Sequence, residues 1–355
     1  MMRKKVALAI SGGVDSAISA YLLQEMGYEV VGVHFQFWAW GKNLSSSAKI
    51  KNNLIDDIRE KIGLRIETIK EENYFKKSIV DNFLSELSKG QTPNPCMRCN
   101  PFVKFKLLKD FAKKENIFNI STGHYARIES NHSRIYKLIK GVDPEKDQSY
   151  MLCNLNQELL SRTIFPLGRT YKKDNIDIGK NLGLKIIEFP ESQDLCFVDT
   201  KYYKQFISES IPDSIQPGDI IDSSEKIIGQ HKGLVYYTIG QRKDIRVSAE
   251  KPYYVIRKDF IQNQLIVGHI DELGRDQMVV NNLNWIYKQP EMPLTCDVKI
   301  RYRSPYVRCS IEIASEGTIK VNLSRKLRDV TPGQYAVFYS GDEVLGGGII
   351  SGKEQ

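Results

Sequence analysis

Several features that define whole classes of protein are scarce or missing in this sequence of 355 residues. It has only six cysteines, too few for a disulfide-stapled scaffold of this length. No run approaches the roughly 20 apolar residues that a membrane-spanning helix needs. The basic residues 1–5 precede a short apolar run that Ser11, Gly12 and Gly13 interrupt, so no signal peptide is predicted. These absences favour a cytoplasmic protein with reduced thiols and no membrane contact.

The composition also excludes disorder and fibrous structure. Hydrophobic residues make up 41% of the chain, and its 25 glycines and 13 prolines form no repeat. A chain of this length can build two or three domains, each with its own core. The formal net charge of +8 favours an anionic partner.

The first 200 or so residues alternate between strand and helix patterns. Residues 6–10 form a continuous apolar run, residues 17–26 have helical spacing, and residues 29–35 are rich in strand formers. This alternation predicts an α/β domain with a doubly wound parallel sheet and ligands at the carboxyl ends of its strands. From about residue 205, short β-rich runs between turn residues replace the helices. We therefore expect three domains: an α/β domain at 1–204, a small β-rich domain at 205–274 and a C-terminal β-barrel at 275–355.

A glycine-rich loop with the sequence Ser-Gly-Gly-Val-Asp-Ser occupies residues 11–16, between a predicted strand and a predicted helix. Two glycines allow a tight turn, hydroxyls add donors, and the helix N-terminus attracts anions, so the loop predicts a phosphate site. Asp15 suits a Mg²⁺ ion bound to the phosphate better than the phosphate itself. The loop has neither the Walker A ending nor the dinucleotide glycine pattern. The alternative is an ordinary strand–turn–helix junction.

A second motif places Cys96 and Cys99 two residues apart, after a proline-rich entry and before the basic predicted helix 102–114. Nearby positive charge and a helix N-terminus predict lowered thiol pKa values. Cys196 is a third candidate. The remaining cysteines lie in apolar or strand contexts typical of packing residues: Cys153, Cys296 and Cys309.

Three interpretations of Cys96, Cys99 and Cys196 remain open. A structural zinc site would need a fourth ligand, and the sequence has no second CxxC pair to supply it. Three thiolates could hold a [4Fe–4S] cluster with one iron left open. Alternatively, one thiol carries a persulfide and another resolves it by thiol–disulfide exchange.

Further motifs extend over nearly the whole chain, and with the first two they identify a family. The sequence resembles the bacterial tRNA-specific 2-thiouridylases, which belong to the PP-loop ATP pyrophosphatases. The stretches that carry this resemblance are SGGVDS at 11–16, TPNPCMRCN at 92–100, STGHYAR at 121–127, KDQSYML at 146–152, LCF at 195–197, GQHKGLVYYTIGQRK at 229–243, RYR at 301–303, and TPGQYAVFY with LGGGII near the end.

The resemblance implies ATP-dependent sulfur transfer to the wobble uridine of tRNA. AMP is transferred to the uracil O2, Cys196 delivers sulfur to C2 as a persulfide, and Cys99 acts as the second nucleophile. Cys96 stands beside them as a further catalytic candidate. The ATP-binding residues implied are Ala9, Ile10, Ser11, Gly12, Gly13, Val14, Asp15, Ser16, Phe35 and Gly123.

The resemblance also implies tRNA contacts and a flipped target base. Asn94, Pro95 and Cys96 would line the base, and His124 would contact phosphate or base, unless it is a core histidine. The other contacts implied are Lys146, Asp147, Gln148, Arg301, Tyr302 and Gln334. A strand through residues 295–302 would put Lys299, Arg301 and Arg303 on one face and Tyr302 on the other. Alternatively, these residues form a solvated polar surface without a binding role.

The sequence departs from the family at two places. Cys96 stands where many relatives have an aspartate, which strengthens the three-thiol interpretation. Residues 34–38 are aromatic where the family usually has a polar pair. The leading hypothesis is a tRNA sulfurtransferase that uses a persulfide donor or a sulfur-relay protein. The alternatives are an amide-forming ATP pyrophosphatase and a zinc-containing RNA-binding module.

Overall fold

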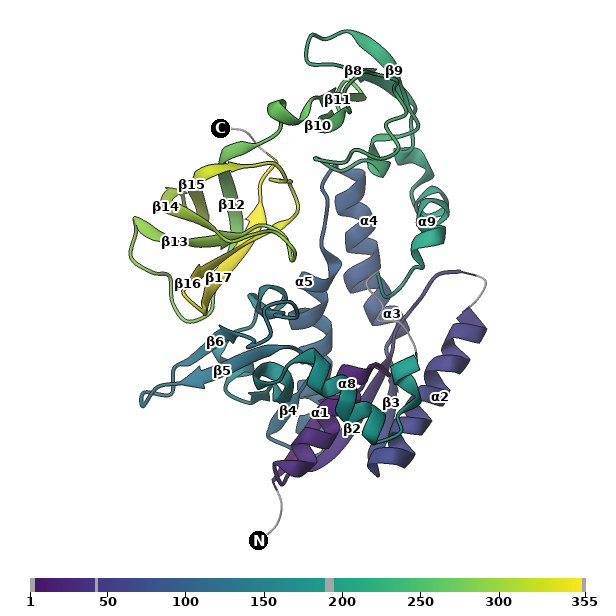
Figure 1. Ribbon diagram of the computed structural model, residues 1–355, viewed down its shortest axis with the longest axis vertical. Coiled ribbons are helices and arrows are strands. Elements are labelled where there is room, and N and C mark those ends of the chain that lie inside the picture. Colours follow the sequence, from purple (N-terminus) through teal and green to yellow (C-terminus); the bar gives the residue numbers. More distant parts are fainter. Residues whose placement is uncertain (1–3, 42–43, 189–194, 353–355) are drawn as a thin grey trace.

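The computed structural model describes residues 4–41, 44–188 and 195–352 and contains three β-sheets. Figure 1 shows an α/β region at the N-terminal end, a small sheet at the opposite end, and a barrel beside them. Among these described residues, no helix has the length and apolar character needed to cross a membrane.

Five parallel strands form the first sheet, in the order β3–β2–β1–β4–β7. Their bounds are Lys5–Ala9 (β1), Glu29–Gln36 (β2), Arg65–Lys70 (β3), Asn119–Ser121 (β4) and Thr163–Ile164 (β7). The strand order reverses between β1 and β4, so the segments after these two strands lie next to each other at the carboxyl edge. This is the place where open α/β sheets bind ligands.

Helices cover both faces of this sheet, which confirms the doubly wound fold. Alternate strand residues point to opposite faces: Val6 and Leu8 pack in one core and Ala7 in the other. Residues of α1 (Val14–Glu25) and α2 (Leu44–Ile62) join the first core, and residues of α6 (Lys106–Lys114) join the second. Helix α8 (Lys172–Asn181) packs against α1.

Short helices connect the sheet to the rest of the molecule. Two π-helical turns interrupt them, Lys76–Val80 and Asn100–Phe105, so the helix expected over residues 102–114 begins with a π turn. Such turns are rare and occur often at functional sites. The α-helices in this part are Glu72–Phe75 (α3), Asp81–Ser88 (α4), Pro95–Cys99 (α5), Gln157–Leu160 (α7) and Tyr203–Ser210 (α9).

The middle sheet has four strands in the order β10–β11–β8–β9 around a small core of its own. The strands are Gly218–Ile221 (β8), Ile227–His231 (β9), Tyr254–Asp259 (β10) and Gln264–Gly268 (β11).

The third sheet is a six-stranded barrel to which the α/β region adds a hairpin. The barrel strands run in the order β12–β15–β14–β13–β16–β17, and β12 pairs with β17 to close the ring. They are Arg275–Trp285 (β12), Leu294–Lys299 (β13), Val307–Ser315 (β14), Thr318–Leu327 (β15), Tyr335–Ser340 (β16) and Glu343–Ile350 (β17).

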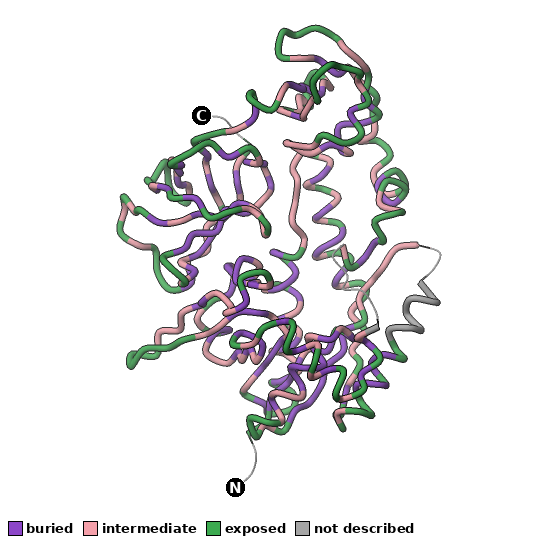
Figure 2. Tube along the Cα trace, viewed as in Figure 1, coloured by how far each residue is buried: buried purple, intermediate pink, exposed green. Residues whose placement is uncertain are grey.

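The added hairpin consists of Ala126–Ser130 (β5) and Tyr136–Lys140 (β6), and β6 pairs with β17. Figure 2 shows buried residues along the barrel strands, while the tip of the hairpin is exposed. The sequence did not predict this pairing, because the two segments are about 200 residues apart.

Candidate active site

The loop at residues 11–16 joins β1 to α1, as predicted, and its own hydroxyls hold it in shape. Ser16 Oγ donates to the Gly13 carbonyl at 2.8 Å, and the Ser11 backbone N–H donates to Ser16 Oγ at 3.2 Å. Gly12 has a φ of +80°, a conformation that favours glycine. No side chain caps the N-terminus of α1 at Gly13, so this end of the helix suits an anion.

Asp15 is the centre of a polar network. Its Oδ1 accepts hydrogen bonds from Lys172 Nζ at 2.7 Å and from the Tyr125 hydroxyl at 2.8 Å. Asn175 Nδ2 donates to the Tyr125 oxygen at 2.9 Å. The Lys172 side chain is only 8% exposed, so α8 places a buried ammonium group at the phosphate loop. One carboxylate held by a lysine is not a complete Mg²⁺ site, and the remaining ligands would have to come from phosphate and water.

Gly123 and Phe35 lie beside this loop, at the carboxyl ends of β4 and β2. A Cβ atom on Gly123 would come within 3.0 Å of the Asp15 backbone, so Gly123 allows the two loops to approach. Phe35 is buried and stacks on Phe37. Gly123 thus meets the loop directly, and Phe35 lies near the carboxyl end of β2, the strand next to β1.

The three candidate thiols share one electrostatic neighbourhood. Cys96 and Cys196 are exposed, whereas Cys99 is buried. Cys96 and Cys196 both influence the pKa of Cys99, and all three influence the pKa of Lys104. Burial lowers the pKa of Lys104. The negative charge that these three sulfurs carry as thiolates acts in the opposite direction and outweighs burial, so the pKa is raised. Lys104 belongs to the π turn that follows Cys99.

The predicted lowering of thiol pKa values is wrong for Cys99. Burial raises the pKa of this thiol to about 12, although the Lys104 charge and the Lys104 backbone N–H both act in the opposite direction. The sequence showed the positive charges but not the burial, and burial is the larger effect here. Cys153, Cys296 and Cys309 are buried, as predicted for packing residues.

Cys196 lies on a short turn that an aromatic cluster anchors. Its neighbour Phe197 is 1% exposed and packs edge-on against Phe75, Phe83 and Phe206. The Trp40 backbone N–H donates to the Phe197 carbonyl at 2.8 Å. The aromatic departure from the family at residues 34–38 belongs to this cluster, through Phe37 and Trp38.

The described residues do not fit a resident metal. Within residues 4–41, 44–188 and 195–352, no group of three or more His, Cys, Asp or Glu side chains is arranged to hold a metal ion. Cys96 and Cys196 act on the pKa of Cys99, but the three thiols are not gathered as the ligands of a zinc ion or an iron–sulfur cluster.

His124 is a neutral, half-buried histidine. Burial and, secondarily, the Lys104 charge lower its pKa to about 3. Its ring packs against Phe105 and Phe165, and its Nδ1 lies 2.6 Å from Thr122 Oγ1. It can therefore offer a neutral hydrogen bond but not a positive charge.

Several residues expected to contact tRNA have partners within the protein. Asp147 is 5% exposed and accepts bonds from the Gly141 and Ser149 backbone N–H groups. Gln148 accepts a bond from the Tyr125 backbone N–H, and Lys146 is half-buried.

The strand expected over residues 295–302 ends at Lys299, so the predicted alternation of faces is wrong. Lys299 is buried, and its ammonium lies over the rings of Tyr302 and Tyr306. Arg301 Nη2 donates to Thr331 Oγ1 at 2.6 Å and to the Ile239 carbonyl at 3.3 Å. Arg301 therefore joins the barrel to the middle domain.

The residues around the predicted base site form the start of α5. Asn94 caps this helix, because its Oδ1 accepts the Cys96 backbone N–H at 3.2 Å, and Pro95 occupies the first turn. Gln334 reaches this region from the barrel, where its Nε2 donates to the Thr92 carbonyl at 2.7 Å.

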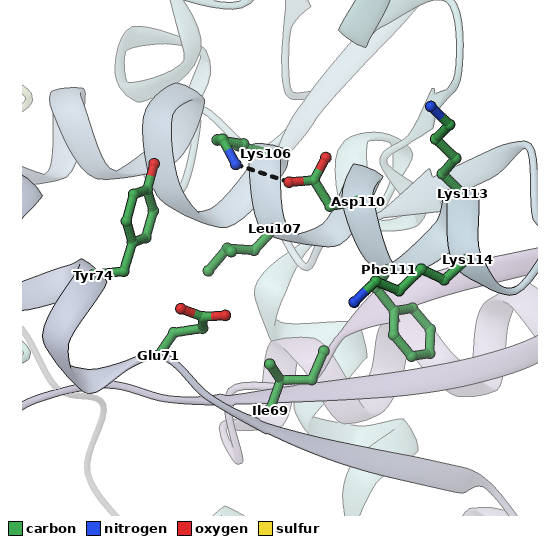
Figure 3. Close-up of a pocket in the computed structure, with 9 residues that line it drawn as sticks. All are labelled: Ile69, Glu71, Tyr74, Lys106, Leu107, Asp110, Phe111, Lys113 and Lys114. Carbon is green, nitrogen blue, oxygen red and sulfur yellow. Dashed lines mark hydrogen bonds and ion pairs between the residues drawn. The ribbon is translucent and has the colours of Figure 1, made fainter.

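A separate hollow of about 670 Å³ lies between the end of β3 and the outer face of α6. Figure 3 shows the Lys106–Asp110 ion pair of α6 across from Glu71 and Tyr74. Its lining contains none of the predicted site residues: it consists of Ile69, Glu71, Tyr74, Lys106, Leu107, Asp110, Phe111, Lys113 and Lys114.

Sequence reasoning missed Lys172, Tyr125 and Phe197, whereas it included Lys104 among the basic residues expected to act on the thiols. Two of them carried a weak signal, because Tyr125 and Phe197 lie inside recognised motifs. Lys172 is one of several lysines in its segment, and nothing in the local pattern separates it from Lys173.

A parallel sheet with a phosphate loop at its reversal point, followed by two β domains, defines a nucleotide-binding α/β protein with added β modules. Family models match the three parts in order: "tRNA methyl transferase HUP domain" at residues 4–200, "tRNA methyl transferase PRC-barrel domain" at 204–269 and "Aminomethyltransferase beta-barrel domain" at 275–350.

Curated relatives match the chain over nearly its full length. The tRNA-specific 2-thiouridylase MnmA of Geotalea uraniireducens is 39% identical over 356 residues, covering 98% of this chain and 95% of the relative. MnmA 2 of Clostridium tetani is 38% identical over 362 residues, covering 99% of each. The chain belongs to the tRNA-specific 2-thiouridylase family.

A solved structure is similar at a much lower level. It is the U34-tRNA thiolase NcsA from Methanococcus maripaludis with its [4Fe-4S] cluster, at 18% identity and a TM-score of 0.36, covering 60% of this chain and 67% of that one.

Proposed function

We propose that this protein transfers sulfur to C2 of the wobble uridine of tRNA and consumes ATP. The products are 2-thiouridine, AMP and pyrophosphate. The observation that supports this most is that one α/β domain holds both the loop at residues 11–16 and the thiols Cys96, Cys99 and Cys196, two of which are close enough to act on the pKa of Cys99. The domain boundaries at about residues 204 and 274 are part of the proposal, with adenylation and the target base before the first boundary and further tRNA contacts after it.

In the first half-reaction, the uracil O2 attacks the α-phosphate of ATP, and pyrophosphate leaves. The backbone of residues 9–16 and the N-terminus of α1 would bind the phosphates, with Mg²⁺ near Asp15 and the adenosine between Phe35 and Gly123. Lys172 adds positive charge to the phosphate side of this site. Adenylation is needed because the uracil carbonyl oxygen is otherwise a poor leaving group.

In the second half-reaction, Cys196 delivers the sulfur. Its exposure suits loading by a persulfide donor or a sulfur-relay protein. The terminal persulfide sulfur attacks C2, and AMP leaves with the O2 oxygen. Cys99 then attacks Cys196 Sγ, the S–S bond breaks, and the sulfur stays on C2 as the thione. A cellular thiol reduces the resulting Cys99–Cys196 disulfide.

The tRNA would approach the side on which α5 and the barrel meet. Asn94, Pro95 and the exposed Cys96 would line a flipped base, with neutral His124 as a hydrogen-bonding group. The internal partners of Asp147 and Arg301 favour a supporting role for these two residues. The reaction would take place in the cytoplasm, where tRNA and sulfur carriers occur together.

Nucleoside mass spectrometry of unmodified tRNA tests this function. We expect 2-thiouridine at position 34 after anaerobic incubation with the protein, ATP, Mg²⁺, a low-molecular-weight persulfide as sulfur donor and a reducing thiol, and none without ATP. Cys196→Ser should abolish thiolation while tRNA binding and folding persist. Full activity of Cys196→Ser would contradict the persulfide assignment. ATP cleavage to AMP without any thiolated nucleoside would favour the amide-forming alternative.

A further inference from the structure

One turn of the C-terminal barrel holds the segment that leads into the cysteine helix. The turn is Thr331–Gln334, and it contacts Thr92 from both sides of its peptide. The Thr92 backbone N–H donates to the Pro332 carbonyl at 2.8 Å, and Gln334 Nε2 donates to the Thr92 carbonyl at 2.7 Å. Both backbone polar groups of Thr92 are thus satisfied by the barrel.

The barrel turn and the segment around Thr92 approach each other closely. A Cβ atom on Gly333 would lie 2.8 Å from the Thr92 backbone nitrogen and 2.9 Å from Gln91 Cβ. Gly333 also has a φ of +88°, so both the contact and the conformation favour glycine.

The turn itself is a fixed part of the barrel. The Gly333 backbone N–H donates to the Ile350 carbonyl at 3.0 Å, and the Ile350 backbone N–H donates to the Gln334 carbonyl at 2.8 Å. Arg301 bonds Thr331 and the Ile239 carbonyl, which ties the turn to the middle domain as well. A displacement of Thr92 would therefore have to break contacts to a closed sheet.

Only two residues separate Thr92 from the start of α5. Pro93 restricts the backbone before it, and Asn94 caps the helix through the Cys96 N–H. The other side of the helix is held by Asn154, which donates to the Met97 carbonyl at 3.2 Å, and by Arg98, which donates to the Ser78 carbonyl at 3.0 Å. The position of Cys96 and Cys99 thus depends on contacts at both ends of α5.

We propose that the barrel turn Thr331–Gln334 is a positioning element of the thiol site, and that Gln334 is its positioning residue. Gln334 acts through Thr92 to hold α5 in position. This keeps the Cys99 thiol buried and fixes its position relative to Cys196. The barrel is then part of the machinery that shapes the thiol site, in addition to any contact it makes with RNA. The inference does not depend on the proposed thiolation.

Site-resolved alkylation tests this inference without an activity assay. The full-length chain, with all six cysteines, is treated with iodoacetamide and the labelling rate of each cysteine is measured by mass spectrometry. Gln334→Met keeps the length of the side chain but removes the donor to Thr92. We expect Cys99 to label roughly three- to ten-fold faster, as the loss of one hydrogen bond predicts. The buried thiols Cys153, Cys296 and Cys309 should keep their rates.

The matched control is Asn322→Ala, which removes a side-chain hydrogen bond to Glu312 between two strands of the barrel. It should leave the Cys99 rate unchanged. An unchanged Cys99 rate in Gln334→Met, or an equal rise in the control, would overturn the proposal.

Gly333→Ala provides a second, independent test, because its added Cβ pushes the turn away from Thr92 without removing a polar group. If Gln334→Met raises the rates of all buried thiols together, the fold is lost, and Gly333→Ala decides instead. A Cys99-specific rise in that variant supports the proposal, and an unchanged Cys99 rate refutes it.

Discussion

At the residue scale, Cys99 shows how burial can outweigh local charge. The basic segment after it favours a thiolate, and Lys104 does act in that direction. Yet the thiol is 4% exposed, and the cost of placing a charge there raises its pKa to about 12. Cys99 is thus a protonated thiol at neutral pH until something opens or neutralises its surroundings.

The pH dependence of Cys99 alkylation follows from this shift. The reactive thiolate of a free cysteine, whose pKa is about 8.5, is nearly fully formed by about pH 10, so its alkylation rate then levels off. For Cys99, we expect the rate to keep rising about ten-fold per pH unit beyond pH 9, because its pKa lies near 12. Lys104→Met should slow alkylation at every pH, whereas Lys109→Met, which removes an ion pair with Glu158, should not. A plateau near pH 8 would show that positive charge outweighs burial.

Lys172 is the clearest case of a functional candidate that only the structure reveals. Its buried ammonium has a carboxylate partner in Asp15, so it is a charged group that the fold retains at the phosphate loop. Its neighbour Lys173 is exposed.

Lys172→Met should therefore weaken ATP use, whereas Lys173→Met should not. We expect pyrophosphate release to fall at least ten-fold, with tRNA binding unchanged. The stability loss should be smaller than the roughly 3–5 kcal/mol for breaking a fully buried ion pair, because Asp15 is partly exposed. Pyrophosphate release and thermal unfolding measure the two effects. Equal activity of both variants would remove Lys172 from the site.

At the element scale, the turn that carries Cys196 depends on aromatic packing. Phe197 fixes it against helices α3, α4 and α9 through Phe75, Phe83 and Phe206. The same turn leaves Cys196 exposed. An exposed thiol is thus carried by a segment whose adjacent residue is fully buried.

Phe197→Ala should destabilise this element strongly. Truncating a buried phenylalanine costs about 3–5 kcal/mol, and here the loss falls on the turn with Cys196. We expect a lower melting temperature and faster proteolysis near residue 197. Phe118→Ala is the control, because its ring is 64% exposed and its loss should cost under about 1 kcal/mol. Similar melting temperatures for the two variants would contradict the anchoring role.

At the scale of the whole molecule, the α/β domain and the barrel share a hydrophobic core. One cluster contains Ala7 and Leu108 from the α/β domain together with Tyr335, Val337 and Val344 from the barrel. The buried Tyr150 hydroxyl donates to the Tyr335 carbonyl at 3.0 Å. The pairing of β6 with β17 extends the barrel sheet across the same boundary.

A fragment of residues 1–204 should therefore fail to fold as a compact monomer. Without the barrel, the edge of β6 and the apolar residues beneath it are exposed, which favours aggregation. Size-exclusion chromatography and binding of a hydrophobic dye would show this. A monomeric fragment with a cooperative melting transition would contradict the shared core.

The sequence alone determined the features that depend on neighbouring residues. The alternation of strand and helix, the loop at residues 11–16, the packing role of Cys153, and family membership all follow from local pattern and motif order. These features can be predicted because backbone preferences and the spacing of apolar side chains act over a few residues.

The tertiary structure decided what depends on proximity across the chain. It placed Lys172 on Asp15, Gln334 on Thr92 and the β5–β6 hairpin on the barrel. It also raised the pKa of Cys99, against the prediction from local charge. Burial and long-range hydrogen bonds arise only when distant segments pack together, so no local pattern of residues encodes them.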